Sequence, residues 1–156
     1  MDAVRPATSA DLPRLVELCR VARAELTEQR GGWIWARREA RPEPVDASLA
    51  EAIDDPDQVV VAGELDGYVV GYGLARLESL DDGSRLGVVD DLYTEEPFRE
   101  LGVGEAMMDE LVAFCRQQQC VGVDSLALPG DRETKNFFEG FGLVARAIVV
   151  HKDLAP

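Results

Sequence analysis

The segment that most constrains the fold of this chain is Arg99-Glu100-Leu101-Gly102-Val103-Gly104, where a strand pattern passes through a glycine-containing turn into a helix pattern. Residues 86–94, just upstream, are rich in Val, Leu and Tyr, which is typical of a β-strand. Downstream, the apolar residues that follow helical spacing and predict a helix from about Gly104 are Val103, Met107, Leu111 and Phe114. A strand, turn and helix in this order present unpaired backbone N–H groups and the positive end of a helix dipole, which favours anion binding.

Two common phosphate-binding loops do not fit this turn. The dinucleotide fingerprint G-x-G-x-x-G requires a third glycine, and Met107 occupies that position. The P-loop ends in Gly-Lys followed by Ser or Thr, and the sequence contains no such tripeptide. The remaining pattern is R-x-x-G-x-G, in which Gly102 and Gly104 permit a close approach of the backbone to a ligand.

The rest of the sequence predicts a mixture of helices and strands. The expected strands cover residues 4–8, 58–62, 68–75, 85–93, 121–128 and 146–152. The expected helices begin at about Leu12 and Gly104 or cover residues 47–53 and 133–141, while residues 28–44 have an irregular pattern. This order, β-α-α-β-β-β-α-β-α-β, contains no repeat or low-complexity linker, so we expect one domain over residues 1–156.

The composition narrows the range of partners. Thirty acidic and sixteen basic residues give a formal net charge of −14, which argues against nucleic acid as a ligand. This charge is compatible with a cationic partner such as an amine, although solubility alone is a sufficient explanation. No apolar run is long enough to span a membrane, so we expect no membrane partner.

The cysteines and the N-terminus indicate a cytoplasmic protein. Cys19, Cys115 and Cys120 are odd in number and follow no paired spacing, which favours free thiols in a reducing compartment. The first residues lack the basic and apolar regions of a signal peptide. With His151 as the single histidine and no paired cysteines, we expect no metal site.

Leu92-Tyr93-Thr94, followed after four residues by R-x-x-G-x-G, resembles the acetyl-CoA motif of the GNAT (GCN5-related N-acetyltransferase) superfamily. The spacing matches without a gap, and Thr94 replaces the usual valine. The order of predicted elements is also that of this superfamily. The resemblance implies an α/β (α+β) fold, a mixed and mostly antiparallel sheet flanked by helices. It further implies acetyl-CoA or another acyl-CoA as co-substrate, a primary amine as acceptor, and the possibility of a homodimer.

The resemblance also assigns roles to individual residues. Backbone amides of Leu101 to Glu105, with Arg99 nearby, would hold the CoA pyrophosphate, and amides near Tyr93 would bond the pantetheine and thioester carbonyl. The complete set expected to bind acyl-CoA is Leu92, Tyr93, Thr94, Arg99, Glu100, Leu101, Gly102, Val103, Gly104, Glu105, Asp131, Thr134 and Phe138.

The candidate for deprotonating the amine is Asp90, the first residue of an acidic pair in the motif strand. Neighbouring strand residues point to opposite faces, so we expect Asp90 to share a face with Leu92 and Asp91 to face the other way. The resemblance places the amine near Asp90 and leaves Asp91 a structural role. A solvated strand residue remains an alternative for Asp90.

One residue departs from the superfamily pattern. Phe138 occupies the position at which many members have a tyrosine that protonates the departing sulfur. A phenyl ring can pack beside pantetheine but donates no proton, and general acid catalysis is typically worth about 10²–10⁴ in rate. A thiol with a pKa of about 8.5 can leave as the thiolate, and Tyr93 or a water could replace the acid. The alternative is a non-catalytic acyl-CoA-binding domain. Because the motif strand has no cysteine, direct attack in a ternary complex is the expected route.

Overall fold

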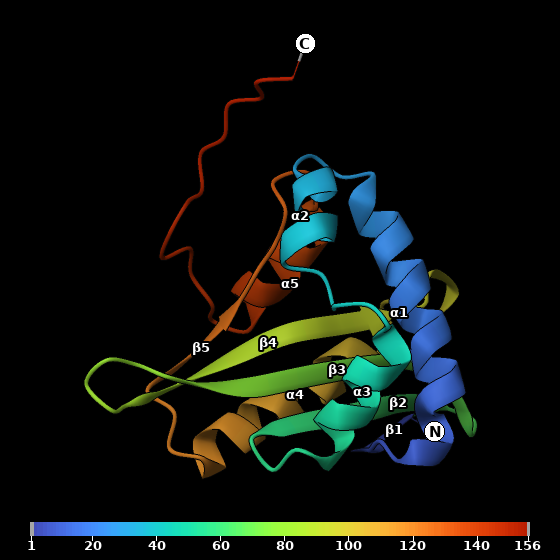
Figure 1. Ribbon diagram of the computed structural model, residues 1–156. Coiled ribbons are helices and arrows are strands. Elements are labelled where there is room, and N and C mark those ends of the chain that lie inside the picture. The colour runs from blue at the N-terminus through green and yellow to red at the C-terminus, as the bar shows by residue number, and fades with distance from the viewer. Residues whose placement is uncertain (1, 156) are drawn as a thin grey trace.

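A computed structural model describes residues 2–155, in which five strands form one sheet with helices on both faces (Figure 1). The strands follow one another across the sheet in the order β1 (Asp2–Pro6), β2 (Gln58–Leu65), β3 (Tyr68–Ser79), β4 (Arg85–Thr94) and β5 (Gly122–Ser125). The first four pair antiparallel, and β5 pairs parallel to β4. The predicted mixed, mostly antiparallel sheet is therefore confirmed.

The helices divide between the two faces of the sheet. The helical elements are α1 (Leu12–Thr27), α2 (Gly32–Arg38), α3 (Val45–Asp54), α4 (Val103–Gln117) and α5 (Arg132–Gly140). Leu15 of α1 and Leu49 of α3 pack with Tyr72 on one face, whereas Met107 and Leu111 of α4 pack on the other. Within the described part of the chain, none of these helices is long and apolar enough to cross a membrane.

Some predicted elements, such as the strand expected over 4–8 and found at Asp2–Pro6, differ only at their ends, but three segments differ more. The expected irregular region contains α2, a helix of seven residues whose short length and neighbouring glycines hide its periodicity. The strand expected over 121–128 covers only Gly122–Ser125. The strand expected over 146–152 is absent, and these residues extend away from the sheet without entering its ladders (Figure 1). A strand needs a partner edge, which local sequence does not supply.

Helix α4 approaches the sheet unusually closely because glycines line the contact. A Cβ atom built on Gly63 of β2 would lie 2.5 Å from Val103 Cγ1 and 3.0 Å from Met107 Sδ. Any larger residue would push α4 outward. The position of the helix, and of its N-terminus at Val103, therefore depends on the absence of a side chain at Gly63.

We expect Gly63→Ala to lower the free energy of unfolding by about 1–3 kcal/mol, because the added methyl group overpacks the contact with α4. Urea denaturation followed by circular dichroism measures this change. The matched control is Gly140→Ala in α5, where a Cβ atom would meet nothing within 4 Å. Equal effects of the two substitutions would contradict the tight contact.

Candidate active site

Strands β4 and β5 separate beside the predicted acyl-CoA motif. Their parallel pairing runs from Leu86 opposite Gly122 to Val89 opposite Ser125. Beyond Val89, β4 continues to Thr94 along β3 alone, and residues 126–131 belong to no strand. The peptide groups of Leu92, Tyr93 and Thr94 on the β5 side therefore border an opening between the two strands. This is where the resemblance expects amides that bond an acyl-pantetheine.

The N-terminus of α4 lies at the same opening. Gly102 caps the helix with φ +92°, a left-handed conformation that favours glycine, and no described side chain accepts a hydrogen bond from the first turn. Glu100 is also left-handed, with φ +68°. The bend formed by these two residues turns the chain from β4 into α4 and leaves the first N–H groups of the helix without an intrahelical partner. Such a helix end attracts anions.

The opening is completed by the first turns of α5. A Cβ atom on Gly104 would lie 3.4 Å from Phe137 and 3.8 Å from Thr94 Oγ1, so β4, α4 and α5 meet at this glycine. Phe137 was not among the expected site residues. Phe137 and Phe138 both fit the apolar pattern of a helix, and sequence spacing alone does not distinguish which ring faces Gly104. Phe138 packs into the apolar cluster of α4 and is only 8% exposed.

Asp131 and Thr134, two of the expected acyl-CoA-binding residues, bond to each other. The Asp131 carboxylate caps α5 by accepting from the Thr134 N–H at 3.2 Å and from its hydroxyl at 2.6 Å. These contacts fix the start of α5 and thereby the position of Phe137. Binding of acyl-CoA by either side chain stays a prediction.

The Arg99 side chain is directed toward α1. Its Nη2 donates to Glu25 Oε1 at 2.9 Å, and its Nε donates to the Thr94 carbonyl at 2.8 Å. The hydroxyl of Tyr93 also donates to Glu25. Burial and the nearby Glu25 carboxylate raise the pKa of Tyr93. Glu25, which the sequence analysis did not single out, thus joins the motif strand to α1.

The acidic pair does not alternate across the sheet as expected. Leu74 of β3 lies opposite Asp91, and Ala75 lies opposite Val89, so Asp90 is the extra residue of a β-bulge. The bulge turns both carboxylates to the same side, where they line one cleft. Leu92, expected to share the face of Asp90, packs with α4 on the opposite side. The alternation of side chains between the two faces of a sheet is interrupted wherever a strand contains an extra residue.

This cleft, of about 410 Å³, is lined by both carboxylates and by several arginines. Arg76 Nε donates to Asp90 Oδ2 at 2.9 Å, and the Asp90 side chain remains 28% exposed. Partial burial raises the pKa of Asp90, while the positive charge of Arg76 opposes this and the charge of Asp91 adds to it. Asp90 is thus the accessible carboxylate of the pair.

Asp91 has a different environment. It accepts two hydrogen bonds from Arg41, at 3.1 and 2.6 Å, and one from the Tyr72 hydroxyl at 2.6 Å. The Arg41 side chain, which is 8% exposed, also donates to Ser48 of α3 at 2.8 Å. The pair ties the segment between α2 and α3 to the middle of β4. The hydrogen bonds that Asp91 accepts join parts of the protein to one another, so its role is structural.

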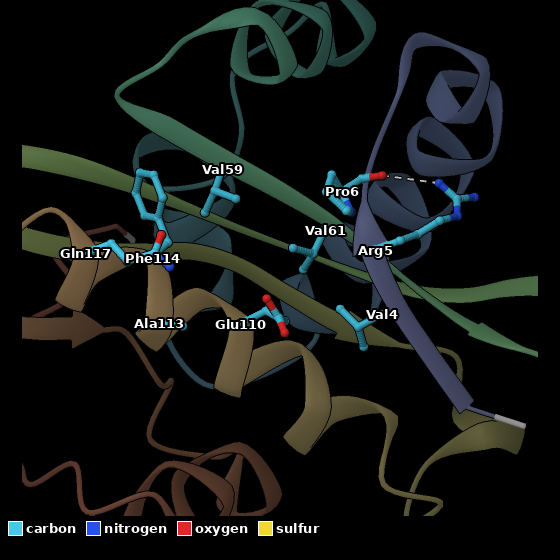
Figure 2. Close-up of a pocket in the computed structure, with 9 residues that line it drawn as sticks. All are labelled: Val4, Arg5, Pro6, Val59, Val61, Glu110, Ala113, Phe114 and Gln117. Carbon is cyan, nitrogen blue, oxygen red and sulfur yellow. Dashed lines mark hydrogen bonds between the residues drawn. The ribbon is translucent and has the colours of Figure 1, made fainter.

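A second hollow, of about 140 Å³, lies at the opposite edge of the sheet between β1, β2 and α4. Figure 2 shows Val4, Val59, Val61 and Phe114 around it, with Arg5 turned to the Pro6 carbonyl. Strand β3 lies between the two strands that line this hollow and the opening between β4 and β5. It therefore plays no part in the candidate active site.

Comparisons with known proteins agree with this arrangement. The family model described as Acetyltransferase (GNAT) family matches residues 21–143, and the chain belongs to this family. The tetramutant of protein BH1408 from Bacillus halodurans superposes with a TM-score of 0.82 at 15% identity, over 97% of this chain and 99% of that one.

Two further solved structures share the fold. Glucosamine-6-phosphate N-acetyltransferase from Arabidopsis thaliana superposes with a TM-score of 0.70 at 19% identity, over 99% of both chains. An aminoglycoside acetyltransferase from an uncultured soil metagenomic sample, in complex with sisomicin, superposes with a TM-score of 0.71 at 17% identity, over 99% of this chain and 96% of that one. No curated protein matches the sequence significantly.

We expect Asp91→Ala to destabilise the protein by about 3–5 kcal/mol, because it leaves the Arg41 guanidinium buried without its partner. Asp90→Ala, which breaks a partly exposed pair with Arg76, should cost no more than about 1 kcal/mol. Chemical denaturation of the two variants checks this difference. A similar loss in both variants would show that the two carboxylates contribute equally to stability, which would contradict the structural role assigned to Asp91 alone.

Proposed function

We propose that this protein transfers an acetyl or other acyl group from acyl-CoA to a primary amine by direct attack in a ternary complex. The observation that carries the proposal is the opening between β4 and β5 beside the uncapped N-terminus of α4. This arrangement supplies an anion-binding end and a row of strand peptide groups to one extended ligand. Membership in an acetyltransferase family supports the same reaction class.

The residues at the opening fit an acyl-CoA. Amides of Leu101 to Glu105 would bind the pyrophosphate at the start of α4, and Phe137 would pack against the pantetheine. Amides of β4 near Tyr93 would donate to the pantetheine and to the thioester carbonyl. Bound there, acyl-CoA supplies an activated acyl thioester, and the donors stabilise the oxyanion that develops during attack.

Asp90 is the residue proposed to accept the proton of the ammonium. It lies at the bulge of β4, in a cleft open to solvent, while Asp91 is engaged by Arg41 and Tyr72. Its raised pKa makes it a stronger base than an ordinary aspartate. Direct attack is favoured because β4 contains no cysteine that could carry an acyl intermediate.

Release of the thiolate is the least specialised step of the proposed reaction. Phe138 is buried in the apolar cluster against α4 and has no hydroxyl, so it donates no proton. Tyr93 has a hydroxyl, but this hydroxyl donates to Glu25, and its raised pKa makes it a weaker acid than an ordinary tyrosine. This observation favours a second candidate function, a non-catalytic acyl-CoA-binding domain, which the amine assays described below distinguish.

Several broader features belong to the same proposal. The chain would act as one domain in the reducing cytoplasm, in keeping with its free cysteines. Its partners would be acyl-CoA and a small amine or a protein amine, rather than nucleic acid or a membrane, in keeping with the net charge of −14. The names of two similar structures, a glucosamine-6-phosphate and an aminoglycoside acetyltransferase, support an amine acceptor.

Isothermal titration should detect micromolar binding of acetyl-CoA to the wild-type protein. Gly104→Glu should weaken binding by at least about tenfold, because it adds a negative charge and bulk at the helix end beside Phe137. Gly140→Glu is the matched control, since that glycine lies in open space. A wild-type protein that does not bind acetyl-CoA would exclude both the transferase and the binding-domain functions.

The rate constant kcat/KM for an amine, followed by release of free thiol, should fall as the pH falls through the raised pKa of Asp90. The sign follows because only the ionised carboxylate accepts a proton, and its pKa lies above the ordinary value of about 3.9. Asp90→Asn should lower kcat/KM about 10²–10⁴-fold and remove this acidic limb. Asp109→Asn on the exposed side of α4 is the control. Tight acetyl-CoA binding without turnover of any amine would favour the non-catalytic alternative.

A further inference from the structure

The cleft beside Asp90 has a lining in which charges of opposite sign balance. Its charged residues are Arg38, Arg41, Arg76, Glu39, Asp90 and Asp91. The chain as a whole has thirty acidic residues and only sixteen basic ones, so the cleft is richer in positive charge than the rest of the protein. A ligand of this cleft therefore meets both signs of charge at close range.

The ion pairs of this lining differ in how well a ligand can reach them. Arg41 and Asp91 are buried, and their hydrogen bonds join parts of the protein to one another. The pair of Arg76 and Asp90 is more open, because these side chains are 39% and 28% exposed. The Arg76–Asp90 pair is therefore the part of the lining that a small ligand can contact with both of its charges.

The pair also leaves hydrogen-bonding capacity unused. Arg76 donates from Nε to Asp90 Oδ2 at 2.9 Å and from Nη1 to Glu78 Oε1 at 3.1 Å. Among the described residues, neither Arg76 Nη2 nor Asp90 Oδ1 has a hydrogen-bond partner. A guanidinium has five N–H donors, and both oxygens of a carboxylate accept. The cleft thus offers an unused cationic donor directly beside an unused anionic acceptor.

Electrostatics then favour one class of amine over the others. The ammonium of a simple amine or a polyamine is attracted to Asp90, but the neighbouring Arg76 repels it. An amine that also has an acidic group meets the opposite charge at both contacts, with its ammonium at Asp90 and its acidic group at Arg76. Because the two side chains bond directly to each other, the two charges of such a ligand must lie only a few covalent bonds apart.

We propose that the acceptor is a small zwitterionic amine with a carboxylate or phosphate close to its amine, and that Arg76 selects it by binding this acidic group. The inference rests on the proposed acyl transfer and names the class of its acceptor. The bound amine lies at Asp90, the residue proposed to accept its proton, so Arg76 determines specificity. Polyamines and protein lysines lack the neighbouring acidic group. A cleft of about 410 Å³ has the size of a small-molecule site.

Matched acceptors test the selection for an acidic group. Free alanine and serine are each compared with the corresponding amide, and phosphoethanolamine with ethanolamine, with acetyl-CoA as the acyl donor. The acidic member of the carboxylate pairs or of the phosphate pair should have a kcat/KM at least about tenfold higher, although an amide lowers the basicity of its amine and so leaves more of it unprotonated. Equal rates within every pair, or a preference for the neutral members or for spermidine, would overturn this inference while establishing acyl transfer.

Arg76→Gln tests the residue itself. The ratio of kcat/KM for the acidic member to that for the neutral member should fall about 10–100-fold, because one charge-assisted hydrogen bond is lost. Arg76→Lys should restore part of the ratio, since it keeps the charge without the planar fork. Arg85→Gln, at an exposed arginine where β4 begins, is the matched control. A structural role of Arg76 would lower both rates alike, and an unchanged ratio would refute the selection.

A binding measurement separates this inference from the proposed reaction. Ligand-observed NMR, with CoA present, reports whether each of the same amines binds to the wild-type protein and to Arg76→Gln. Binding of an acidic member that Arg76→Gln weakens, without turnover of any amine, would support the assigned ligand class and exclude the acyl transfer. If neither the amino acids nor phosphoethanolamine bind or react, the inference is overturned, whatever the activity toward other amines.

Discussion

The close contact between α4 and the sheet is the constraint on which the other features of the structure depend. Gly63 of β2 lets Val103 and Met107 lie against the strand backbone, which places the first turn of α4 directly beyond the end of β4. The chain must then reverse within residues 99–102, and the left-handed Glu100 and Gly102 accomplish this. An uncapped helix end beside an open strand edge is the geometric consequence.

A single extra residue in β4 gives the two adjacent aspartates different environments. In a regular strand one of them would face the α4 side, which is filled by Val89, Met107 and Leu111. The bulge instead brings both to the other face, where Arg41 engages Asp91 from the segment between α2 and α3. That buried pair fixes the cleft wall, and Asp90 remains accessible beside it. The bulge thereby leaves one carboxylate buried in an ion pair and its neighbour exposed in the cleft.

Much of this fold could be predicted because its main elements carry local signals. The glycine turn before α4 and the β-branched strands are encoded within a few residues. The errors share a different cause. The bulge at Asp90 depends on pairing with β3, the orientation of Phe137 depends on the position of Gly104, and residues 146–152 need an edge supplied from elsewhere. Arg41 and Glu25 escaped notice because their partners lie at least 50 residues away in sequence.

The acidity of the chain makes the proposed anion site depend on its backbone. Glu100 and Glu105 flank the start of α4, and the nearest arginine of the motif, Arg99, bonds to Glu25 on α1. A phosphate approaching this helix end therefore meets peptide N–H groups and the helix dipole before it meets a side-chain cation. Peptide groups carry no net charge that neighbouring carboxylates could neutralise by pairing. A protein with a formal charge of −14 can thus retain a site for an anionic co-substrate, provided that the bend at Glu100 and Gly102 keeps these groups uncapped.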